Sequence, residues 1–520
     1  MTAKTTPAQV RAAWITRSEI ALIDLREEDP FAKDHPLFAV QIPLSRLELE
    51  ILDKVPRKAA PIVLYDNGEG LTSRAANVLS SLGYTAVSEL DGGLEGWRKA
   101  GYELFQDVNS CSKAFGELVE HCRHTPSLPA PEAKALIESE FDLVVLDARR
   151  YEEFQTMSIP RGMSVPGAEL VLRAREIAPD PTTTIIVNCA GRTRSIIGAQ
   201  SLINAGVPNP VFALRNGSIG WKLAGQALDH GKAARFPNVT PKHVTEAKAK
   251  ARAVSYRAGV RRLDPAILAS LVQDDTRTLY RFDVRTQEEY ASGHIPGFKS
   301  SPGGQLVQET DMNAAVRGAR IVLADDVGPR ADMSASWLAQ MNWEVYVLDG
   351  GFDGKLETGT WTPSYPTLPD AQTINVAEME TADLTVVDLA TSPQYRKGHI
   401  PGAWFVVRAR LAQALNKLPL DKDFVLTSPD GALARLAAAD LAALTGHKVW
   451  VLQGGTAAWA ATGRSLVTGL TDAASDPDDI YRRPYEGTDN TATAMQAYLD
   501  WEFGLVDQLA RDGTHGFFVI

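Results

Sequence analysis

Residues 185–195, with the sequence IIVNCAGRTRS, form the stretch that decides the fold of this 520-residue chain. A short apolar run of β type ends at Cys189 and leads into a turn of small residues that carries two arginines and a serine. A helix-like stretch, residues 196–200, follows directly. Apolar strands that alternate with helices are typical of a parallel sheet covered on both faces, and ligands bind such sheets at the carboxyl ends of the strands. The pattern therefore predicts an α/β fold with Cys189 at a ligand-binding edge.

The same pattern occurs four times along the chain. Each copy opens with an apolar run that ends in aspartate, and a second apolar run leads to the position that Cys189 occupies in the second copy. The opening aspartates are Asp24, Asp147, Asp283 and Asp388, and the second positions are Asp66, Cys189, Asp325 and Ser428. The spacing between the two positions is equal in the first three copies and two residues shorter in the fourth. Only the second copy has a cysteine where chemistry is expected.

The length of the repeat indicates tandem domains, because solenoid repeats run to only about 20–50 residues. We predict domains over residues 1–106, 107–235, 236–365 and 366–467, followed by a C-terminal tail over residues 468–520. The tail begins acidic and loop-like, and its residues 494–509 have the pattern of an amphipathic helix. We expect this helix to dock on the body of the protein.

Composition restricts the class of protein further. The chain has 44% hydrophobic residues, a formal net charge of −11 and three cysteines. These values suit several globular cores, argue against nucleic acid as a partner, and leave no disulfide framework. Every apolar run is far shorter than a membrane span, and the first residues lead into no hydrophobic signal segment. We expect a cytoplasmic protein with no membrane partner, and the sequence leaves its oligomeric state open.

The motifs of the repeat resemble those of rhodanese (sulfurtransferase) domains. The elements that carry the resemblance are Asp147-Ala148-Arg149, His294-Ile295-Pro296-Gly297, the cysteine loop and Asp349-Gly350-Gly351. The resemblance implies four tandem rhodanese-like domains, each a mainly parallel sheet flanked by helices on both faces. An inactive copy followed by an active one resembles the two-domain arrangement of thiosulfate sulfurtransferases. The active copy departs from the family pattern, with Ser158-Ile159-Pro160-Arg161 and Arg215-Asn216-Gly217 at two of the motifs.

The loop after Cys189 has the composition needed to activate a thiol. A cysteine attacks as its thiolate, and a free thiol with a pKa near ~8.5 needs help at neutral pH. We expect backbone N–H groups of the turn to converge on the sulfur, a helix that starts near Ser195 to add its positive end, and the two arginines to add fixed charge. Cys189 is the predicted catalytic residue. The predicted substrate-binding residues are Ala190, Gly191, Arg192, Thr193, Arg194 and Ser195.

Two features of this loop are further expectations. The small Ala190 and Gly191 should keep the mouth of the site open. Arg192 and Arg194 should remain unburied and capture an anionic donor, because neither lies in an apolar run. The alternative for Cys189 is a buried, inert cysteine at the end of a strand, which two adjacent arginines argue against.

Other candidate residues carry less weight. Cys111 and Cys122 lie in a helical stretch beside His121 and His124, where ordinary packing is favoured over a metal site or a resolving cysteine. We expect neither a metal ion nor a cofactor. Arg215 either adds charge at the rim of the site or is a surface arginine.

Asp147, Arg149 and Glu153 are expected to form a structural ion-pair network rather than to contact substrate. The loops of the first, third and fourth copies should lack a matching positive cradle. A cysteine placed at position 66 or 325 should therefore create no second site.

Three classes of function remain. The first is a sulfurtransferase that moves sulfane sulfur from thiosulfate, or a related donor, through a Cys189 persulfide to cyanide or a cellular thiol. The second is a cysteine-dependent phosphatase or arsenate reductase, but such loops place five residues between cysteine and arginine, whereas four lie between Cys189 and Arg194. The third is a non-catalytic binding scaffold, which the three copies without cysteine favour. The cysteine loop favours the sulfurtransferase.

Overall fold

The computed structural model describes residues 3–139 and 141–520, and these form four five-stranded sheets of the same topology. In each sheet the strands stand in the order first, fifth, fourth, second, third along the chain. All neighbouring strands within the described sheets are parallel. The predicted α/β fold of four tandem domains with parallel sheets is confirmed.

The first sheet consists of β1 (Ala3–Thr5), β2 (Ala21–Asp24), β3 (Ala39–Gln41), β4 (Ile62–Tyr65) and β5 (Val87–Leu90). The second consists of β6 (Ser127–Leu128), β7 (Leu143–Asp147), β8 (Gly162–Ser164), β9 (Thr184–Asn188) and β10 (Val211–Leu214). The third consists of β11 (Arg261–Leu263), β12 (Leu279–Asp283), β13 (Lys299–Ser300), β14 (Arg320–Ala324) and β15 (Glu344–Leu348). The fourth consists of β16 (Thr373–Ile374), β17 (Leu384–Asp388), β18 (Trp404–Phe405), β19 (Asp423–Thr427) and β20 (Val449–Leu452).

Helices connect the strands. Those of the first domain are α1 (Pro7–Thr16), α2 (Glu28–Lys33), η1 (Leu44–Arg46), α3 (Leu47–Lys54), α4 (Thr72–Ser81) and α5 (Gly93–Lys99). Those of the second are α6 (Ser110–Arg123), α7 (Ala130–Glu138), α8 (Tyr151–Thr156), α9 (Glu169–Ile177), α10 (Thr193–Asn204) and α11 (Gly217–Leu223). Those of the third are α12 (Pro241–Arg257), α13 (Pro265–Gln273), α14 (Gln287–Ser292), α15 (Gly303–Gln308), α16 (Thr310–Asn313) and α17 (Pro329–Gln340). Those of the fourth are α18 (Val376–Thr381), α19 (Ser392–Lys397), η2 (Arg408–Arg410), α20 (Leu411–Ala414), α21 (Ala432–Thr445) and α22 (Gly455–Ala461).

Both faces of the second sheet are covered by helices, as its apolar strands require. All five residues of β9 are buried. Leu170 of α9 and Leu202 of α10 pack in the core on one face, and Ile137 of α7 and Trp221 of α11 pack in the core on the other. Strands buried on both faces cannot alternate apolar and polar residues, so the continuous apolar run follows from this packing.

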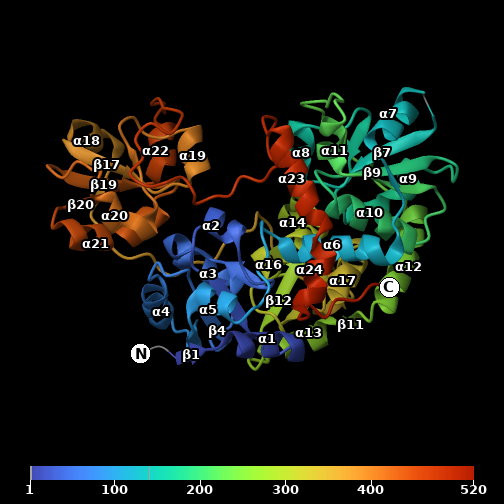
Figure 1. The fold of residues 1–520 in the computed structure, drawn as a ribbon, viewed down its shortest axis with the longest axis horizontal. Helices are drawn as coiled ribbons and strands as arrows, with labels where there is room; N and C mark the ends of the chain where they lie inside the picture. Colours follow the sequence, from blue (N-terminus) through green and yellow to red (C-terminus); the bar gives the residue numbers. More distant parts are fainter. Residues whose placement is uncertain (1–2, 140) are drawn as a thin grey trace.

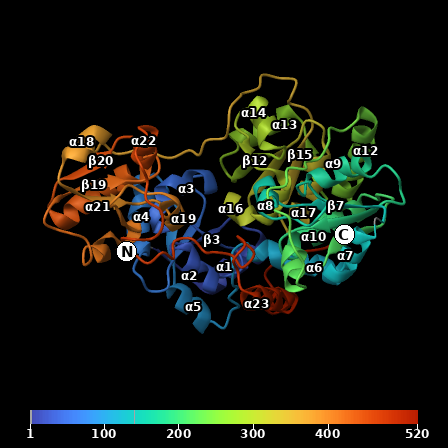
Figure 2. The same ribbon diagram turned by 90° about the horizontal axis from the view of Figure 1, so that it is seen from above.

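The domains are not packed equally against one another. One continuous hydrophobic cluster contains Leu64 of the first domain, Leu323 of the third and Phe115 of α6. The fourth domain has its main cores to itself, and it contacts the body through the first domain, where Arg408 pairs with Glu48 at 2.8 Å. Figures 1 and 2 show it at one end of the molecule, beside the first domain. The first three domains therefore form the compact body of the molecule.

The tail returns from the fourth domain to this body (Figure 1). It contains α23 (Ala492–Phe503) and α24 (Leu505–Asp512), so the prediction of a helix that docks on the body is confirmed. The expectation of one continuous helix over residues 494–509 is wrong, because the helix is interrupted at Gly504, between α23 and α24. Glycine is a poor residue for a helix interior, at a cost of about 1 kcal/mol. Leu505 and Leu509 of α24 join the core that the first and third domains share.

The opening aspartate of each repeat holds an arginine two residues later in three domains. Asp283 and Arg285 of the third domain form a buried ion pair of 2.7 Å. The fourth domain has Ala390 at the arginine position, and burial there raises the pKa of the Asp388 carboxyl to about 6. The same position thus carries a paired carboxylate in one domain and an unpaired carboxyl in another.

Asp388→Asn is expected to stabilise the fourth domain above about pH 6, and Asp283→Asn to destabilise the third. Folded Asp388 keeps its proton up to a pH of about 6, whereas the unfolded residue ionises near pH 3.8. The free energy of unfolding therefore falls by up to about 3 kcal/mol as the pH rises from 3.8 to 6. Asp388→Asn removes this loss of stability, because asparagine does not ionise. Asp283→Asn leaves the buried Arg285 without the Asp283 carboxylate, which costs about 3–5 kcal/mol of stability. Calorimetry on both sides of pH 5 measures the two effects, and shifts of the same sign would contradict this account.

Candidate active site

Cys189 follows β9, the central strand of the second sheet, at the carboxyl edge where such sheets bind ligands. The residue is only 1% exposed. Its Sγ donates to Oγ of Ser195 at 3.4 Å, and that hydroxyl donates to the carbonyl of Arg192 at 2.9 Å. The structure therefore brings the predicted nucleophile and the predicted Ser195 together.

The turn after Cys189 enters α10 at Thr193, two residues before the predicted start near Ser195. Burial raises the pKa of the Cys189 thiol. The charge of Arg194, together with the hydroxyl and backbone N–H of Ser195, acts in the opposite direction and lowers it. The start of a helix and a nearby cation are the features that favour a thiolate.

Gly217, the glycine that closes the repeat, fixes the shape of this loop. Its φ is +52°, and a Cβ there would lie 2.3 Å from the carbonyl oxygen of Cys189. The N–H groups of Ser218 and Ile219 donate to the carbonyls of Cys189 and Ala190 at 2.9 and 3.0 Å. These two bonds hold the carbonyls of Cys189 and Ala190 against α11. Only glycine permits so close an approach with this backbone conformation.

Arg194 is the cation of the site. It forms an ion pair with Glu153 of α8 at 2.8 Å, and its side chain is 14% exposed. Glu153 was expected to belong to a structural network with Asp147 and Arg149. Asp147 and Arg149 do form a buried pair of 2.8 Å, but Glu153 instead holds the arginine that faces the thiol. The sequence analysis named Glu153 but gave it a structural role, and its ion pair with Arg194 was not expected.

Arg192 has a different environment from the one predicted. Its guanidinium donates to Glu117 of α6 at 2.7 and 2.8 Å, pairs with Glu120, and lies 4.3 Å from the ring of Phe503. The residue is 5% exposed. The expectation that Arg192 remains unburied is wrong, because carboxylates of α6 far away in the sequence receive it.

The tail closes the mouth that the small residues were expected to keep open. Ala190 is 2% exposed. A Cβ on Gly191 would lie 3.2 Å from Cε1 of Tyr498 and 3.4 Å from Oε2 of Glu502, both on α23. The expectation of an open mouth is therefore wrong. Because Gly191 has no side chain, α23 packs directly against the backbone of the loop, where solvent was expected. The amphipathic pattern of the tail indicated docking but not the place of docking.

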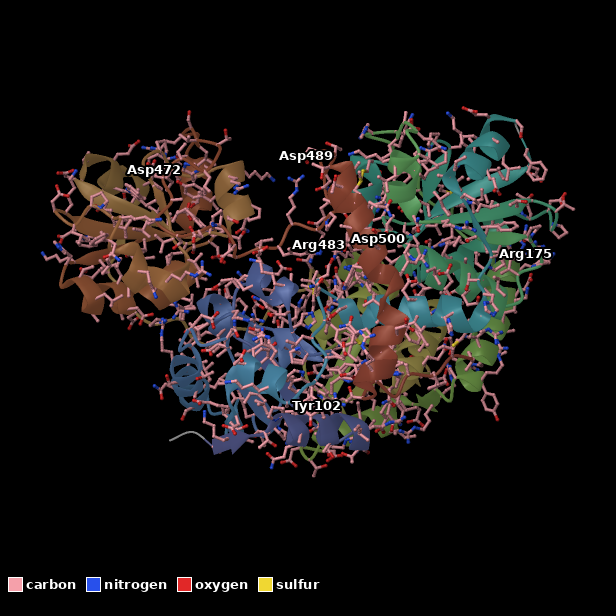
Figure 3. All side chains as sticks on the ribbon, in the orientation of Figure 1. Tyr102, Arg175, Asp472, Arg483, Asp489 and Asp500 are labelled. Carbon is pink, nitrogen blue, oxygen red and sulfur yellow. The ribbon has the colours of Figure 1, made fainter. Side chains whose placement is uncertain are left out.

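A cavity of about 760 Å³ lies beside the loop and reaches Arg194. Its walls come from all three domains of the body and from the tail. They include Glu28, Arg149, Arg150, Glu153, Gln305, Glu309, Arg483 and Tyr485. Figure 3 labels Arg483 in the tail segment that runs toward α23, and Asp500 on α23 itself. The volume is within the usual range for small-molecule sites, about 300–1,000 Å³.

In the other three domains the position of the Cys189 side chain is taken by Asp66, Asp325 or Ser428. Asp66 accepts from the N–H groups of Gly68 and Leu71 at 3.0 and 2.6 Å, and Ser428 Oγ accepts from Ala434 N–H at 3.4 Å. Two backbone N–H donors thus converge on this position in the first domain, and one reaches it in the fourth.

The third domain also retains the arginine. Arg330 follows Asp325 by the same number of residues as Arg194 follows Cys189. It pairs with Asp325 at 2.9 Å and with Glu289 at 2.6 Å, as Arg194 pairs with Glu153. The expectation that no other loop has a positive cradle is wrong for this domain.

The remaining candidates lie away from this chemistry. Arg215 is exposed and donates to Oγ of Ser127 at 3.1 Å. Cys111 is buried, which raises the pKa of its thiol to about 12, and Cys122 is exposed. In residues 3–139 and 141–520, no group of three or more His, Cys, Asp or Glu side chains could hold a metal ion. No helix in those residues has the length and apolar character needed to cross a membrane.

Comparison with known proteins agrees with this architecture. A family model for the rhodanese-like domain matches residues 6–100, 129–224, 264–357 and 374–462. The chain is similar to a solved structure described as thiosulfate sulfurtransferase from Pseudomonas aeruginosa, with 58% identity over 100% of both chains and a TM-score of 0.98. It is also 32% identical over 91 residues to the uncharacterised protein slr1261 from Synechocystis, and this match covers 18% of the chain and 50% of that relative. The chain thus spans about half the length of that relative. The solved structure of the Alr3790 protein from Anabaena matches at 26% identity over 20% of this chain and 83% of that chain, with a TM-score of 0.19.

The family model matches each domain in turn and covers the second to fifth strands of each sheet. The matched segments begin before the strand that opens each repeat and end after the helix or loop that follows the closing glycine. The chain therefore belongs to the family of proteins built from rhodanese-like domains.

Proposed function

We propose that the chain is a thiosulfate sulfurtransferase in which Cys189 carries the transferred sulfur as a persulfide. The observation that carries the proposal is the full-length similarity, at 58% identity, to a structure described as thiosulfate sulfurtransferase. The cysteine loop adds support, because the thiol lies beside the hydroxyl and backbone N–H of Ser195 and the fixed positive charge of Arg194. The proposed donor is thiosulfate, and the proposed acceptor is cyanide or a cellular thiol.

The reaction proceeds in two half-reactions through a covalent intermediate. The Cys189 thiolate attacks the sulfane sulfur of thiosulfate, the sulfur–sulfur bond of the donor breaks, and sulfite leaves with the electron pair. A nucleophilic acceptor then attacks the outer sulfur of the persulfide, and the cysteine leaves as its thiolate. No net oxidation or cofactor is needed, because each step exchanges one bond to sulfur for another.

Arg194 and Ser195 stabilise the anionic states of this cycle. Both lower the pKa of Cys189, and a persulfide anion at the same place gains from the same donors. The cavity beside Arg194 offers the donor an approach from solvent. We place the protein in a reducing compartment such as the cytoplasm, because its three cysteines are free thiols.

Cys189→Ser is expected to abolish sulfur transfer, whereas a Cys111→Ser, Cys122→Ser double variant keeps most of the wild-type activity. The reason is that only Cys189 lies at the strand end with an activating loop. Mass spectrometry of the wild type after exposure to thiosulfate should show a gain of one sulfur atom on the Cys189 peptide. An inactive double variant would instead point to a resolving cysteine.

Arg194→Ala and Arg192→Ala are expected to have different effects. Loss of Arg194 removes the cation beside the thiol, so the donor KM rises by about tenfold or more and the apparent pKa of Cys189 rises. Loss of Arg192 leaves Glu117 buried without its partner and destabilises the protein by about 3–5 kcal/mol. Donor kinetics and thermal unfolding of both variants test this contrast. Normal donor kinetics in Arg194→Ala would refute the role of its charge.

Cysteines introduced at the empty positions test the role of the arginine. In a Cys189→Ser background, Asp325→Cys is expected to form a persulfide slowly, because Arg330 and the nest are in place. Asp66→Cys is expected to form none, because Leu71 occupies the arginine position. Mass spectrometry after thiosulfate exposure gives the result, and alkylation by iodoacetamide controls for access. Equal persulfide formation by both variants would show that the arginine is not what activates the cysteine.

A further inference from the structure

The tail places a buried carboxyl group against the cysteine loop. Glu502 of α23 is 0% exposed. Its Oε1 accepts from the hydroxyl of Tyr498 at 2.7 Å, and its Oε2 has no hydrogen-bond partner among the residues that the structure describes. A buried polar atom without a partner is costly, so its retention calls for a functional reason.

The free oxygen faces the loop that carries the nucleophile. Glycine at position 191 leaves no side chain between the loop backbone and α23, and a Cβ there would lie 3.4 Å from Oε2 of Glu502. Cys189 is two residues earlier in the same turn, and a negative charge on Glu502 raises the pKa of its thiol. The carboxyl and the thiol are therefore electrostatically linked.

Charged and hydrogen-bonding groups from three elements surround Glu502. Helix α6 contributes Glu117 and Lys113, the cysteine loop contributes Arg192, and Tyr498 lies on α23 itself. Burial raises the pKa of Glu502 to about 8, Glu117 adds to this effect, and Lys113, Tyr498 and Arg192 oppose it.

Both nearby cations are engaged elsewhere. Lys113 pairs with Asp107 at 2.8 Å, and Arg192 pairs with Glu117 at 2.7 Å. Neither donates to Glu502, so the carboxyl is free to gain and lose a proton near neutral pH, which is the property of an efficient acid–base group.

The proposed sulfur transfer requires such a group. A buried thiol must lose its proton before it attacks, and the sulfite that leaves is a strong enough base to take one. The other polar residues beside the thiol are unsuited to this task. Arg194 keeps its proton throughout, and the Ser195 hydroxyl is directed at the carbonyl of Arg192. Burial also raises the pKa of Tyr498 well above its ordinary value, so it too keeps its proton.

We propose that Glu502 is the acid–base residue of the Cys189 site, and this inference rests on the proposed sulfurtransferase function. The hydrogen bond of the thiol goes to Oγ of Ser195 and none joins it to Glu502, so the carboxylate accepts the Cys189 proton through one intervening water. The thiolate then attacks the sulfane sulfur of thiosulfate. The donor's sulfur–sulfur bond breaks, sulfite takes the electron pair, and Glu502 gives it the proton. The products are the Cys189 persulfide anion, hydrogensulfite and the regenerated Glu502 carboxylate, so charge and protons balance.

The thiol and the carboxyl then share one proton in the reactive state. Their titrations are coupled, and the pH profile belongs to the pair rather than to either residue. The rate of persulfide formation should rise as the pair loses its first proton and fall as it loses the second. Glutamine at 502 cannot titrate, so the falling limb should disappear.

The experiment measures single-turnover sulfite release from thiosulfate across about pH 5.5–9.5, with persulfide on Cys189 followed by mass spectrometry. Wild type should give a bell-shaped profile. Glu502→Gln, which keeps the size and the Tyr498 hydrogen bond, should be about 100-fold slower near pH 7 and lack the falling limb. Asp500→Asn, a neutralised exposed carboxylate on the same helix, should retain the wild-type rate and profile. The pH dependence of Cys189 alkylation adds a readout independent of turnover, and Glu502→Gln should shift it to lower pH.

The results separate this inference from the proposed function. If Glu502→Gln keeps both limbs and a rate within twofold of wild type while Cys189 still becomes persulfidated, the role of Glu502 is overturned and the sulfurtransferase stands. If wild type forms no persulfide on Cys189, both are overturned. If glutamine prevents folding, Glu502→Asp replaces it, and a slower rate with the bell-shaped profile retained is the expected result. An unchanged Glu502→Asp rate would also overturn the role.

Discussion

Among the glycines of the second domain, Gly217 leaves the least room for a side chain, because it packs against the carbonyl of Cys189. A Cβ on Gly217 would lie 2.3 Å from that oxygen, so the start of α11 can meet the end of β9 only through glycine. This contact orients the turn after the strand and thereby places Arg194 and Ser195. The same contact recurs in the first and fourth domains, where a Cβ on Gly93 or Gly455 would lie 2.8 or 2.1 Å from the matching carbonyl. This loop geometry is therefore shared by the first, second and fourth domains, whereas the cysteine at its first position and the arginine five residues later occur together in the second domain alone.

The second determinant of the site comes from the opposite end of the sequence. Helix α23 covers Gly191, and Phe503 lies over the guanidinium of Arg192. Helix α24 continues directly into the core that the first and third domains share. Because the two helices meet at Gly504, docking of α24 into the core and coverage of the loop by α23 are mechanically connected. The tail therefore packs on the cysteine loop of the second domain, although it follows the fourth domain in sequence.

Local patterns in the sequence predict most of the fold. Apolar runs ended by Asp24, Asp147, Asp283 and Asp388 mark the second strand of every sheet, and the position of Cys189 marks the carboxyl end of the central one. The environment of Arg192 could not be found in this way, because Glu117 lies on α6 and Phe503 on the tail, and neither position follows from a repeat. Glu502 was missed for the same reason, since a glutamate in an amphipathic helix carries no local sign of burial. Arg330 was visible in the sequence, and its role became clear only once Asp325 was seen to bind it.

In the third domain, an ion pair replaces the cysteine of the loop. In the third domain the carboxylate of Asp325 receives the N–H of Arg330 at 2.9 Å and the guanidinium of the same residue, so the protein itself supplies the anion that the loop is shaped to hold. Arg330 also reaches Glu169 of the second domain at 3.1 Å and thus joins the two domains through a buried ion-pair network. The first and third domains and the tail contribute walls to the cavity beside Arg194. The first and third domains, which have aspartate at the position of Cys189, therefore still shape the cavity beside the cysteine loop.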